Sequence, residues 1–213
     1  MRRQLQPELL DTLAPGHPDA LHNRRDLRII NRAAGNYRWF ARTLSRQPEL
    51  PASLLEIGAG TGELGNHLAA KMICADGLDL WPEPDPWPAG RRWHRADLLS
   101  FDGYGEYPVV IGNLIFHQFS AGQLAELGAR LRQSSGLILA NEPARRRRWQ
   151  ALYRVAGPLL GANYVSRHDA HVSVAAGFLG DELPRMLGLP GPEWDCRCHT
   201  TLLGMYRMIA RRK

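Results

Sequence analysis

The residues best suited to chemistry lie in one stretch, SLLEIGAGTGELGNHLAA, at residues 53–70. A carboxylate, Glu56, closes an apolar run, and three glycines follow at alternate positions: Gly58, Gly60 and Gly62. Glycines permit positive φ and let a ligand lie against bare backbone. The leucines that follow are four residues apart, which is typical of a helix, and a helix start offers unpaired N–H groups to an anionic group. The stretch therefore predicts a strand, a tight loop and a helix that together bind a nucleotide-type cofactor.

The acid before the glycines decides which cofactor is favoured. A literal G-x-G-x-x-G is present at Gly60, Gly62 and Gly65, which is the pattern of dinucleotide sites. A pyrophosphate would nevertheless be repelled by the Glu56 carboxylate in a partly buried cleft, whereas a cation would be attracted. S-adenosylmethionine carries a sulfonium and an ammonium and has no phosphate. The loop therefore favours this cofactor, and an NAD-type Rossmann oxidoreductase stays as a remote alternative.

The stretch E-I-G-A-G-T-G at residues 56–62 resembles the first motif of the class I (Rossmann-like) S-adenosylmethionine-dependent methyltransferases. The resemblance extends in order over roughly residues 52–213. It implies methyl transfer from S-adenosylmethionine, with S-adenosylhomocysteine as the product. Asp79 resembles the family's ribose-binding acid, Asp97 the acid that reads the adenine amino group, and Asn113 a contact of the methionine end or the substrate. The implied cofactor site comprises Glu56, Gly58, Ala59, Gly60, Gly62, Asp79, Leu80, Asp97, Leu98 and Asn113.

The elements that must position these residues alternate between strand and helix. Apolar or β-branched runs predict strands within residues 53–57, 72–80, 91–99, 107–116 and 136–140, and a terminal hairpin that turns near 201–204. Apolar residues at helical spacing predict one helix over 19–46 and others after Ser120, over 144–163 and over 180–188, while 164–178 is ambiguous. We expect an α/β fold with a doubly wound, seven-stranded, mostly parallel sheet, an antiparallel terminal strand and an N-terminal helical cap.

The length predicts a single domain over residues 1–213. Within it we expect an N-terminal helical arm or cap (1–50), a cofactor-binding half (52–143), a helical insert over the substrate pocket (144–178), and a terminal helix with a β-hairpin (179–213).

Candidate catalytic and substrate-binding residues follow the strands. His117 comes directly after the fourth predicted strand, at the sheet edge where such folds bind ligands, and its ordinary pKa suits a general base that deprotonates or orients the substrate. Glu142, after the fifth strand, is expected to line the pocket. The cluster RHDAH supplies Arg167, His168 and Asp169 as further pocket candidates, although we interpret it mainly as a polar loop. Its spacing is not specific for a metal, so no metal site is expected.

The composition limits the partners. The net charge is +6, which permits a nucleic-acid or acidic-membrane partner without establishing one. We expect no nucleic-acid partner, because no RNA-binding module is appended. A peripheral membrane contact through the basic run Arg145–Arg148 is a separate hypothesis, since an apolar stretch follows it.

The cysteine content and the absence of long apolar segments bear on the location of the protein. The three cysteines suggest reduced thiols, and no apolar segment suggests a signal peptide or a membrane span, so we expect a cytoplasmic protein. The oligomeric state is not predicted.

The expected function is methyl transfer to a small molecule, with a phenolic or polyketide-like, lipophilic acceptor methylated on oxygen or carbon. An RNA or protein methyltransferase is the alternative. The Asn-Pro-Pro-aromatic motif used to methylate exocyclic amines is absent, because Asn113-Leu114-Ile115-Phe116 shares only its first and last residue types. A non-enzymatic protein that keeps the fold for assembly is a third class, which an intact set of cofactor acids argues against.

Overall fold

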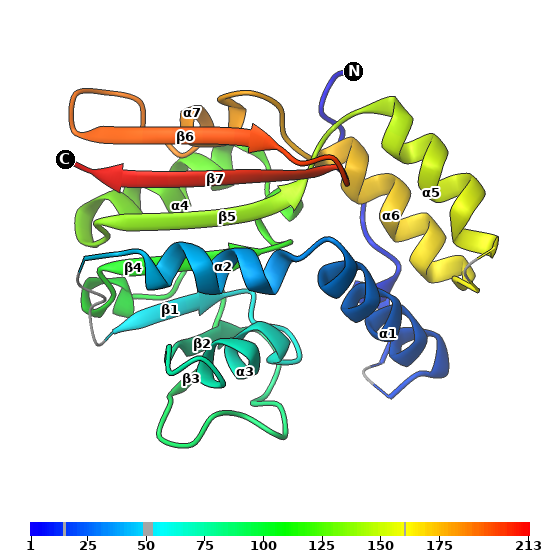
Figure 1. Ribbon diagram of the computed structural model, residues 1–213, viewed down its shortest axis with the longest axis horizontal. Helices are drawn as coiled ribbons and strands as arrows, with labels where there is room; N and C mark the ends of the chain where they lie inside the picture. Colours follow the sequence, from blue (N-terminus) through cyan, green and yellow to red (C-terminus); the bar gives the residue numbers. More distant parts are fainter. Residues whose placement is uncertain (15, 49–52, 160) are drawn as a thin grey trace.

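A seven-stranded sheet forms the centre of the structure, a computed structural model that describes residues 1–14, 16–48, 53–159 and 161–213. The strands are β1 (Leu54–Ile57), β2 (Asp76–Asp79), β3 (Trp93–Arg95), β4 (Val109–Asn113), β5 (Leu137–Pro143), β6 (Trp194–Thr200) and β7 (Met205–Arg212). Their order is β3-β2-β1-β4-β5-β7-β6 (Figure 1). β1 to β5 pair in parallel, and β7 runs antiparallel to both β5 and β6. The predicted sheet and its antiparallel terminal strand are confirmed.

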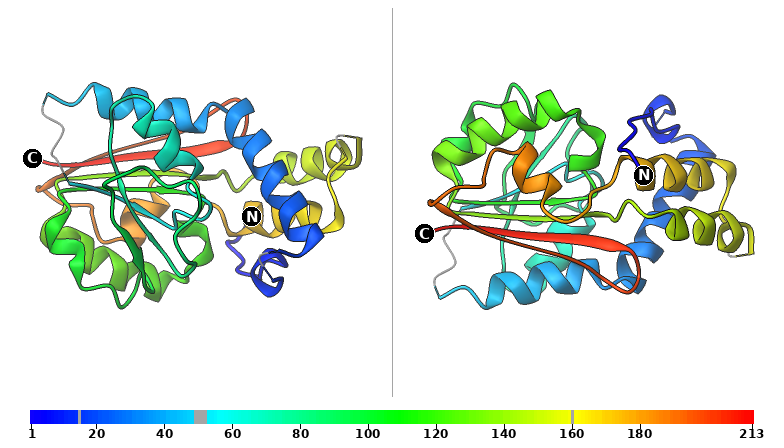
Figure 2. Two further views of the ribbon diagram at one scale, coloured as in Figure 1. Left: turned by 90° about the horizontal axis from the view of Figure 1, so that it is seen from below. Right: turned by 90° about the horizontal axis from the view of Figure 1, so that it is seen from above.

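Helices cover both faces of this sheet (Figure 2). The helices are α1 (Pro18–Ala33), α2 (Asn36–Ser45), α3 (Glu63–Ala69), α4 (Ala121–Ser134), α5 (Arg147–Leu159), α6 (Tyr164–Ala176) and α7 (Glu182–Met186), with 3-10 turns η1 (Leu10–Thr12), η2 (Gly103–Glu106) and η3 (Phe116–Gln118). α2 and α3 pack on one face, and α4 and α7 pack on the other. This is the layered arrangement expected for alternating strands and helices.

The central strand β4 shows why the sheet needs two helical layers. Val109 and Ile111 belong to the apolar core under α2 and α3, whereas Val110 between them belongs to the core under α4. Successive side chains of a strand point to opposite faces, so an uninterrupted apolar run must be covered on both sides. The β-branched run that the sequence places in a central strand therefore lies in the centre of the sheet.

The N-terminal region forms two helices, and the prediction of one helix over 19–46 is wrong. Gly35 adopts φ 65° between α1 and α2, a left-handed conformation that glycine reaches without steric cost. The Asn36 side chain follows the break and donates to the Asn31 Oδ1 atom at 2.9 Å. The chain consequently changes direction: α2 joins the sheet layer, and α1 extends beyond the sheet (Figure 1).

Other boundaries differ by a few residues. The third strand ends at Arg95 instead of near Asp97, and the fifth continues through Pro143, because β7 pairs with β5 up to that residue. The expected helix after Ser120 begins with a capping box, in which the Ser120 and Gln123 side chains bond each other's backbone N–H groups. Most of the ambiguous segment 164–178 forms α6, which ends at Ala176, so the interpretation of RHDAH as a loop is wrong.

A third helical group lies beyond the carboxyl ends of the parallel strands. It consists of α1, α5 and α6, with the chain before α1 laid across α6 (Figures 1 and 2). We call residues 1–13 the N-terminal arm. The Gln4 N–H donates to the Ala175 carbonyl at 3.1 Å, and the Arg3 guanidinium donates to the Phe119 carbonyl at 2.8 Å. The cap over the sheet edge is therefore built from the arm and α1, and α2 is not part of it.

The proposed subdivision of the domain stays a prediction, and its boundary at residue 52 lies outside the described residues. In the part of the chain that the structure describes, no helix is both long enough and apolar enough to cross a membrane.

Candidate functional site

The glycine loop joins β1 to α3 at the carboxyl edge of the sheet. Gly58 and Gly62 adopt φ values of 63° and 76°. A Cβ atom on Gly58 would lie 2.5 Å from the Ile115 Cγ1 atom, and one on Gly62 would lie 2.9 Å from the Pro84 ring. The two positions therefore need glycine for their backbone conformation and for space. The Gly60 N–H donates to the Asp79 Oδ2 atom at 2.8 Å, which joins the loop to the end of β2.

Glu56 is a buried carboxyl group that closes β1 beside the glycine loop. Its side chain is 3% exposed, and its Oε2 atom has no hydrogen-bond partner among the described residues. Burial, followed by the negative charges of Glu63 and Asp79, raises its pKa well above the ordinary value, and the Gly65 N–H offsets this only in part. An unpaired buried carboxylate is costly, and a positively charged hydrogen-bond donor would relieve that cost. The site thus fits the ammonium of S-adenosylmethionine.

The remaining predicted cofactor residues lie along the same edge. The Asp79 carboxylate, at the end of β2, also accepts from the Trp81 N–H at 3.0 Å. Asp97 follows β3, is exposed, and accepts from the Leu99 N–H at 2.8 Å. Leu98 is buried, while Leu80 is 62% exposed. Because β1, β2 and β3 are parallel, their carboxyl ends bring these residues to one edge of the sheet.

Asn113 ends β4 and connects the sheet edge to the cap. Its Nδ2 atom donates to the Asn31 Oδ1 atom of α1 at 3.1 Å, and its Oδ1 atom accepts from Asn141 at 2.9 Å. The next residue, Leu114, has φ 61°, although it is not glycine. Such a conformation costs on the order of 1–3 kcal/mol and is concentrated at functional sites. A cap helix and a strained turn thus meet where the cofactor's methionine end is expected.

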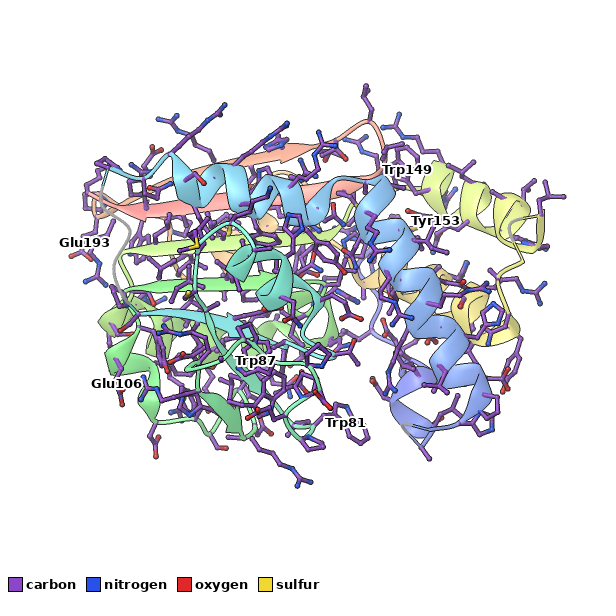
Figure 3. The ribbon with its side chains drawn as sticks, turned by 60° about the horizontal axis from the view of Figure 1, so that its bottom comes forward. Trp81, Trp87, Glu106, Trp149, Tyr153 and Glu193 are labelled. Atoms are coloured by element: carbon purple, nitrogen blue, oxygen red, sulfur yellow. The ribbon has the colours of Figure 1, made fainter. Side chains whose placement is uncertain are left out.

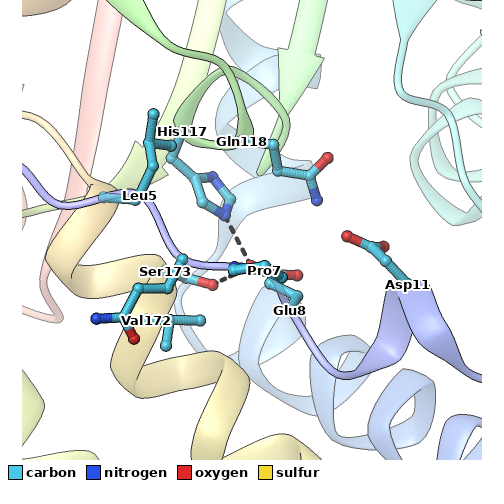
Figure 4. Close-up of a pocket in the computed structure, with 10 residues that line it drawn as sticks. Leu5, Pro7, Glu8, Asp11, His117, Gln118, Val172 and Ser173 are labelled. Atoms are coloured by element: carbon cyan, nitrogen blue, oxygen red, sulfur yellow. Dashed lines mark hydrogen bonds and ion pairs between the residues drawn. The ribbon is translucent and has the colours of Figure 1, made fainter.

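His117 lies in η3 between two carboxylates. Its Nδ1 atom lies 2.6 Å from the Glu142 Oε2 atom. Its Nε2 atom lies 3.1 Å from the Glu8 Oε1 atom, as Figure 4 shows. Glu142 is completely buried and also accepts the N–H groups of Ile115, Phe116 and His117. Glu142 therefore fixes both the η3 backbone and the imidazole ring, instead of lining an open pocket.

The two carboxylates change the protonation of His117. Burial alone would lower the pKa of the imidazole, but the charges and hydrogen bonds of Glu142 and Glu8 raise it to about 10. The same contacts, together with the Ser173 hydroxyl, lower the pKa of Glu8 against the opposing effect of its burial. His117 is consequently an imidazolium near neutral pH in this arrangement. Its neighbours hold it as a charged, oriented donor.

Two cavities meet at this cluster. One, of about 270 Å³, lies under the N-terminal arm, and the other, of about 160 Å³, lies between α1 and α6. Both are lined by the same four residues: Glu8, His117, Gln118 and Ser173. The second cavity also reaches Leu114 and Pro143, at the ends of β4 and β5. An acceptor bound there would lie beside the edge where the glycine loop places the cofactor.

The RHDAH candidates divide between two environments. Asp169 lines the second cavity, and its carboxylate accepts from the Leu9 and Leu10 N–H groups at 2.7 and 3.1 Å, which ties the arm to α6. The Arg167 side chain packs near Gly157, and the His168 side chain is 40% exposed. Neither Arg167 nor His168 is among the residues that line these two cavities. Among the residues that the structure describes, no cluster of three or more acidic, histidine or cysteine residues could hold a metal.

The basic run Arg145–Arg148 is not one exposed patch, which corrects that part of the membrane hypothesis. Arg145 is 4% exposed, and its guanidinium donates to the Gly177 carbonyl at 3.1 Å and forms an ion pair with Glu182. Only Arg146, Arg147 and Arg148 face solvent. Since Arg145 continues from the end of β5, its side chain is used inside the fold.

The sequence did not indicate Glu8, Asn23 or Asp26, although all three line the second cavity. Glu8 lies in a polar stretch between prolines, and Asn23 and Asp26 lie among the arginines of α1. Each is an ordinary polar residue in its local context. Only the folding of the arm and α1 over the sheet edge brings them to the site.

Comparison with solved structures identifies the fold. The plantazolicin methyltransferase BpumL, in complex with a triazolic desmethylPZN analog and SAH, is 12% identical, with 96% of this chain and 93% of that chain covered and a TM-score of 0.72. The related BamL complex is 11% identical, with 93% of each chain covered and a TM-score of 0.69. Human N-acetylserotonin methyltransferase in complex with SAM is 18% identical, with 99% and 63% covered and a TM-score of 0.62.

No protein-family model and no curated protein sequence matches this chain. At these identities the structural likeness shows the fold, and the fold is that of class I S-adenosylmethionine-dependent methyltransferases.

Proposed function

We propose that this chain is an S-adenosylmethionine-dependent methyltransferase that acts on a small-molecule acceptor. The observation that carries the proposal is Glu56, a buried carboxylate with an unpaired oxygen beside a glycine loop. A dinucleotide's phosphates would be repelled there, and an ammonium would be stabilised. Structural neighbours that were crystallised with SAM or SAH support the same cofactor.

The described residues suggest how the cofactor is held. Glu56 receives the ammonium, Asp79 the ribose hydroxyls, and Asp97 with the Leu98 backbone the adenine, while the glycine loop provides bare backbone against which the cofactor lies. When bound, the cofactor supplies a methyl group already activated by a sulfonium. The protein's task is then mainly to place an acceptor atom in line with that methyl group.

The cluster around His117 is placed to orient the acceptor, because it lines both cavities. The arm covers one cavity, and Glu142 fixes the imidazole through its Nδ1 atom. Because the pKa of His117 is raised to about 10, the ring holds its proton near neutral pH. We therefore propose that His117 donates to Glu8 and holds this carboxylate at the cavity, and that it serves as a general base only if Glu8 moves away.

The narrower proposal for the acceptor is a lipophilic compound, phenolic or polyketide-like, methylated on oxygen or carbon. The second cavity supports a lipophilic acceptor, because it is lined by apolar side chains that include Leu10, Leu27, Ile30, Leu114 and Tyr153. The small volumes of the two cavities, about 270 and 160 Å³, favour a small molecule over a folded RNA or protein.

S-adenosylhomocysteine is expected to stabilise the protein against thermal unfolding, whereas NADH and RNA are not. At about 100 times its dissociation constant, a ligand of the folded state adds about 2.7 kcal/mol. For a chain of this size that corresponds to an increase of about 5–10 °C in the unfolding midpoint. Differential scanning fluorimetry with the three ligands measures it. A midpoint that moves with NADH and not with S-adenosylhomocysteine would replace this proposal with the oxidoreductase.

We also propose peripheral contact with an anionic membrane, now through the outer surface of α5. Leu152, Val155 and Leu159 are spaced along one side of this helix and are 48%, 67% and 83% exposed. α5 contains no acidic residue, and exposed arginines lie at its start and at Arg154. Figure 3 shows Trp149 and Tyr153 on the same helix, with Tyr153 also lining the second cavity. A lipophilic acceptor taken from a membrane would thus enter close to its site.

Sedimentation with vesicles tests this surface. The protein is expected to sediment with phosphatidylglycerol vesicles and to remain in solution with phosphatidylcholine vesicles, because each exposed arginine contributes about 1 kcal/mol at an anionic surface. Reversing Arg147 and Arg148 to glutamate should release it. The matched control reverses Arg42 and Arg46, two exposed arginines of the α2 region. Equal release by both double variants would indicate general electrostatic attraction instead of a membrane-facing helix.

A further inference from the structure

The polar wall of the cavity between α1 and α6 presents hydrogen-bond acceptors. Three carboxylates line it: Glu8, Asp26 and Asp169. Two serine hydroxyls nearby already donate to these carboxylates. The Ser166 hydroxyl donates to the Asp26 Oδ2 atom at 2.8 Å, and the Ser173 hydroxyl donates to Glu8. A ligand in this cavity therefore meets oxygen atoms that can still accept, while the serine protons are already used.

Asn23 provides an independent observation. This side chain lines the same cavity, is 2% exposed, and its Oδ1 atom has no donor among the described residues. Its Nδ2 atom donates to the Asp169 Oδ2 atom at 3.2 Å, so flipping the amide would set an oxygen against a carboxylate. A buried acceptor without a donor costs about 1–3 kcal/mol. The cavity thus lacks one hydrogen-bond donor, which a ligand can supply.

The charges around the cavity favour a cationic donor. Asp26 is paired with Arg25 at 3.0 Å, and His117 is shared between Glu142 and Glu8, but no lysine or arginine lines the cavity itself. Asp169 accepts from two backbone N–H groups of the arm and from the Asn23 amide, none of which carries a net charge, and it lies 3.1 Å from the partly exposed His168 ring. The pKa of the neighbouring Asp11 is raised to about 6 by burial and by the charges of Glu8 and Asp169, which is consistent with a negative field.

We infer that this cavity binds the methyl-accepting substrate through a protonated amine on that substrate. The amine would donate hydrogen bonds to the Asn23 Oδ1 atom and to the carboxylates of Glu8 and Asp169. The inference rests on the proposed methyltransferase function and narrows the substrate class to a lipophilic cation, whichever atom is methylated. The apolar lining of the cavity holds the lipophilic body of the acceptor, and the acidic wall holds its ammonium. Glu8 is then a specificity residue that the arm brings to the site.

Three phenols that differ only in the charge of their side chain test this inference. Tyramine carries an ammonium, 4-ethylphenol is neutral, and 3-(4-hydroxyphenyl)propionate carries a carboxylate. With S-adenosylhomocysteine present, ligand-observed NMR titration is expected to show tyramine binding at least about tenfold more tightly than 4-ethylphenol, with the propionate weakest. Equal affinities of the wild-type protein for tyramine and 4-ethylphenol would overturn the inference without any variant.

Single-residue variants test which side chains cause the preference for tyramine. Glu8→Gln and Asn23→Leu should each reduce the preference for tyramine over 4-ethylphenol to about threefold or less. The matched control, Glu106→Gln, changes a carboxylate to an amide at the end of the molecule away from Tyr153, and should keep the full preference (Figure 3). Variants that retain the wild-type preference would assign the amine to another site. Failure of S-adenosylhomocysteine to bind would count against the methyltransferase proposal. The charge preference is a different measurement, the ratio of the affinities for tyramine and 4-ethylphenol, so the two proposals can fail independently.

Discussion

Replacing Glu56 by glutamine is expected to weaken S-adenosylmethionine binding by about 1–3 kcal/mol, which is about 5- to 150-fold. Glutamine keeps the size of the side chain and removes the negative charge that the buried site directs at an ammonium. Titration calorimetry of both proteins measures the difference. The Glu126→Gln variant is the control, because Glu126 is exposed on α4, on the other face of the sheet from α3, and lies 3.8 Å from Arg130. Unchanged affinity in Glu56→Gln would mean that the loop does not bind a cation.

The raised pKa of Glu56 adds a pH dependence to the same experiment. In the empty site the carboxyl holds its proton to a higher pH than usual, and binding of an ammonium favours the charged form. Binding therefore releases a proton, and the affinity should rise as the pH rises through the raised pKa that Glu56 has in the free protein. Calorimetry in two buffers of different ionisation enthalpy detects this proton. Glu56→Gln should release none, so a pH dependence that persists in the variant would assign the proton to another group.

Replacing Glu142 by glutamine is expected to destabilise the fold by about 3–5 kcal/mol, because it leaves a buried imidazolium without its main counter-charge. Glu142 is fully buried and contacts the His117 ring at 2.6 Å, so solvent cannot take its place. At about 2–4 °C per kcal/mol, the unfolding midpoint should fall by about 6–20 °C. Urea unfolding gives the free energy directly. A loss below about 1 kcal/mol would show that the pair is not ionised in the folded protein.

The pH dependence of stability has a definite sign for His117. Its folded-state pKa of about 10 lies above the unfolded value of about 6.5, so its stabilisation is fully present below about pH 6.5 and is lost as the pH rises through about 10. Unfolding free energies measured between about pH 7 and 10 should therefore decline. In His117→Gln this part of the decline should disappear, although the variant is less stable at pH 7. A wild-type profile that rises over this range would contradict the arrangement.

Short-range sequence information was sufficient to predict the cofactor-binding loop at the carboxyl edge of the sheet. The three glycines and Glu56 act through local backbone conformation and through residues within one strand-loop-helix unit, so their spacing indicates their role. The alternation of apolar runs and helical patterns likewise predicts the sheet, because each strand needs cover on the faces that its side chains define. The break at Gly35 was missed because glycine is also tolerated inside a helix, and apolar residues continue at helical spacing across it.

The acceptor side depended on the tertiary structure. Glu8 and His117 are 109 residues apart, and Asn23 and Asp169 are 146 apart, yet each pair is joined by a hydrogen bond. No local pattern encodes such contacts, because they exist only once the arm and α1 pack over the carboxyl edge of the sheet. The sequence by itself therefore determined the fold class and the cofactor loop, through periodicity and backbone freedom. The tertiary structure alone decided the charge on His117 and the acidic wall of the cavity, because a pKa depends on which charges burial brings together.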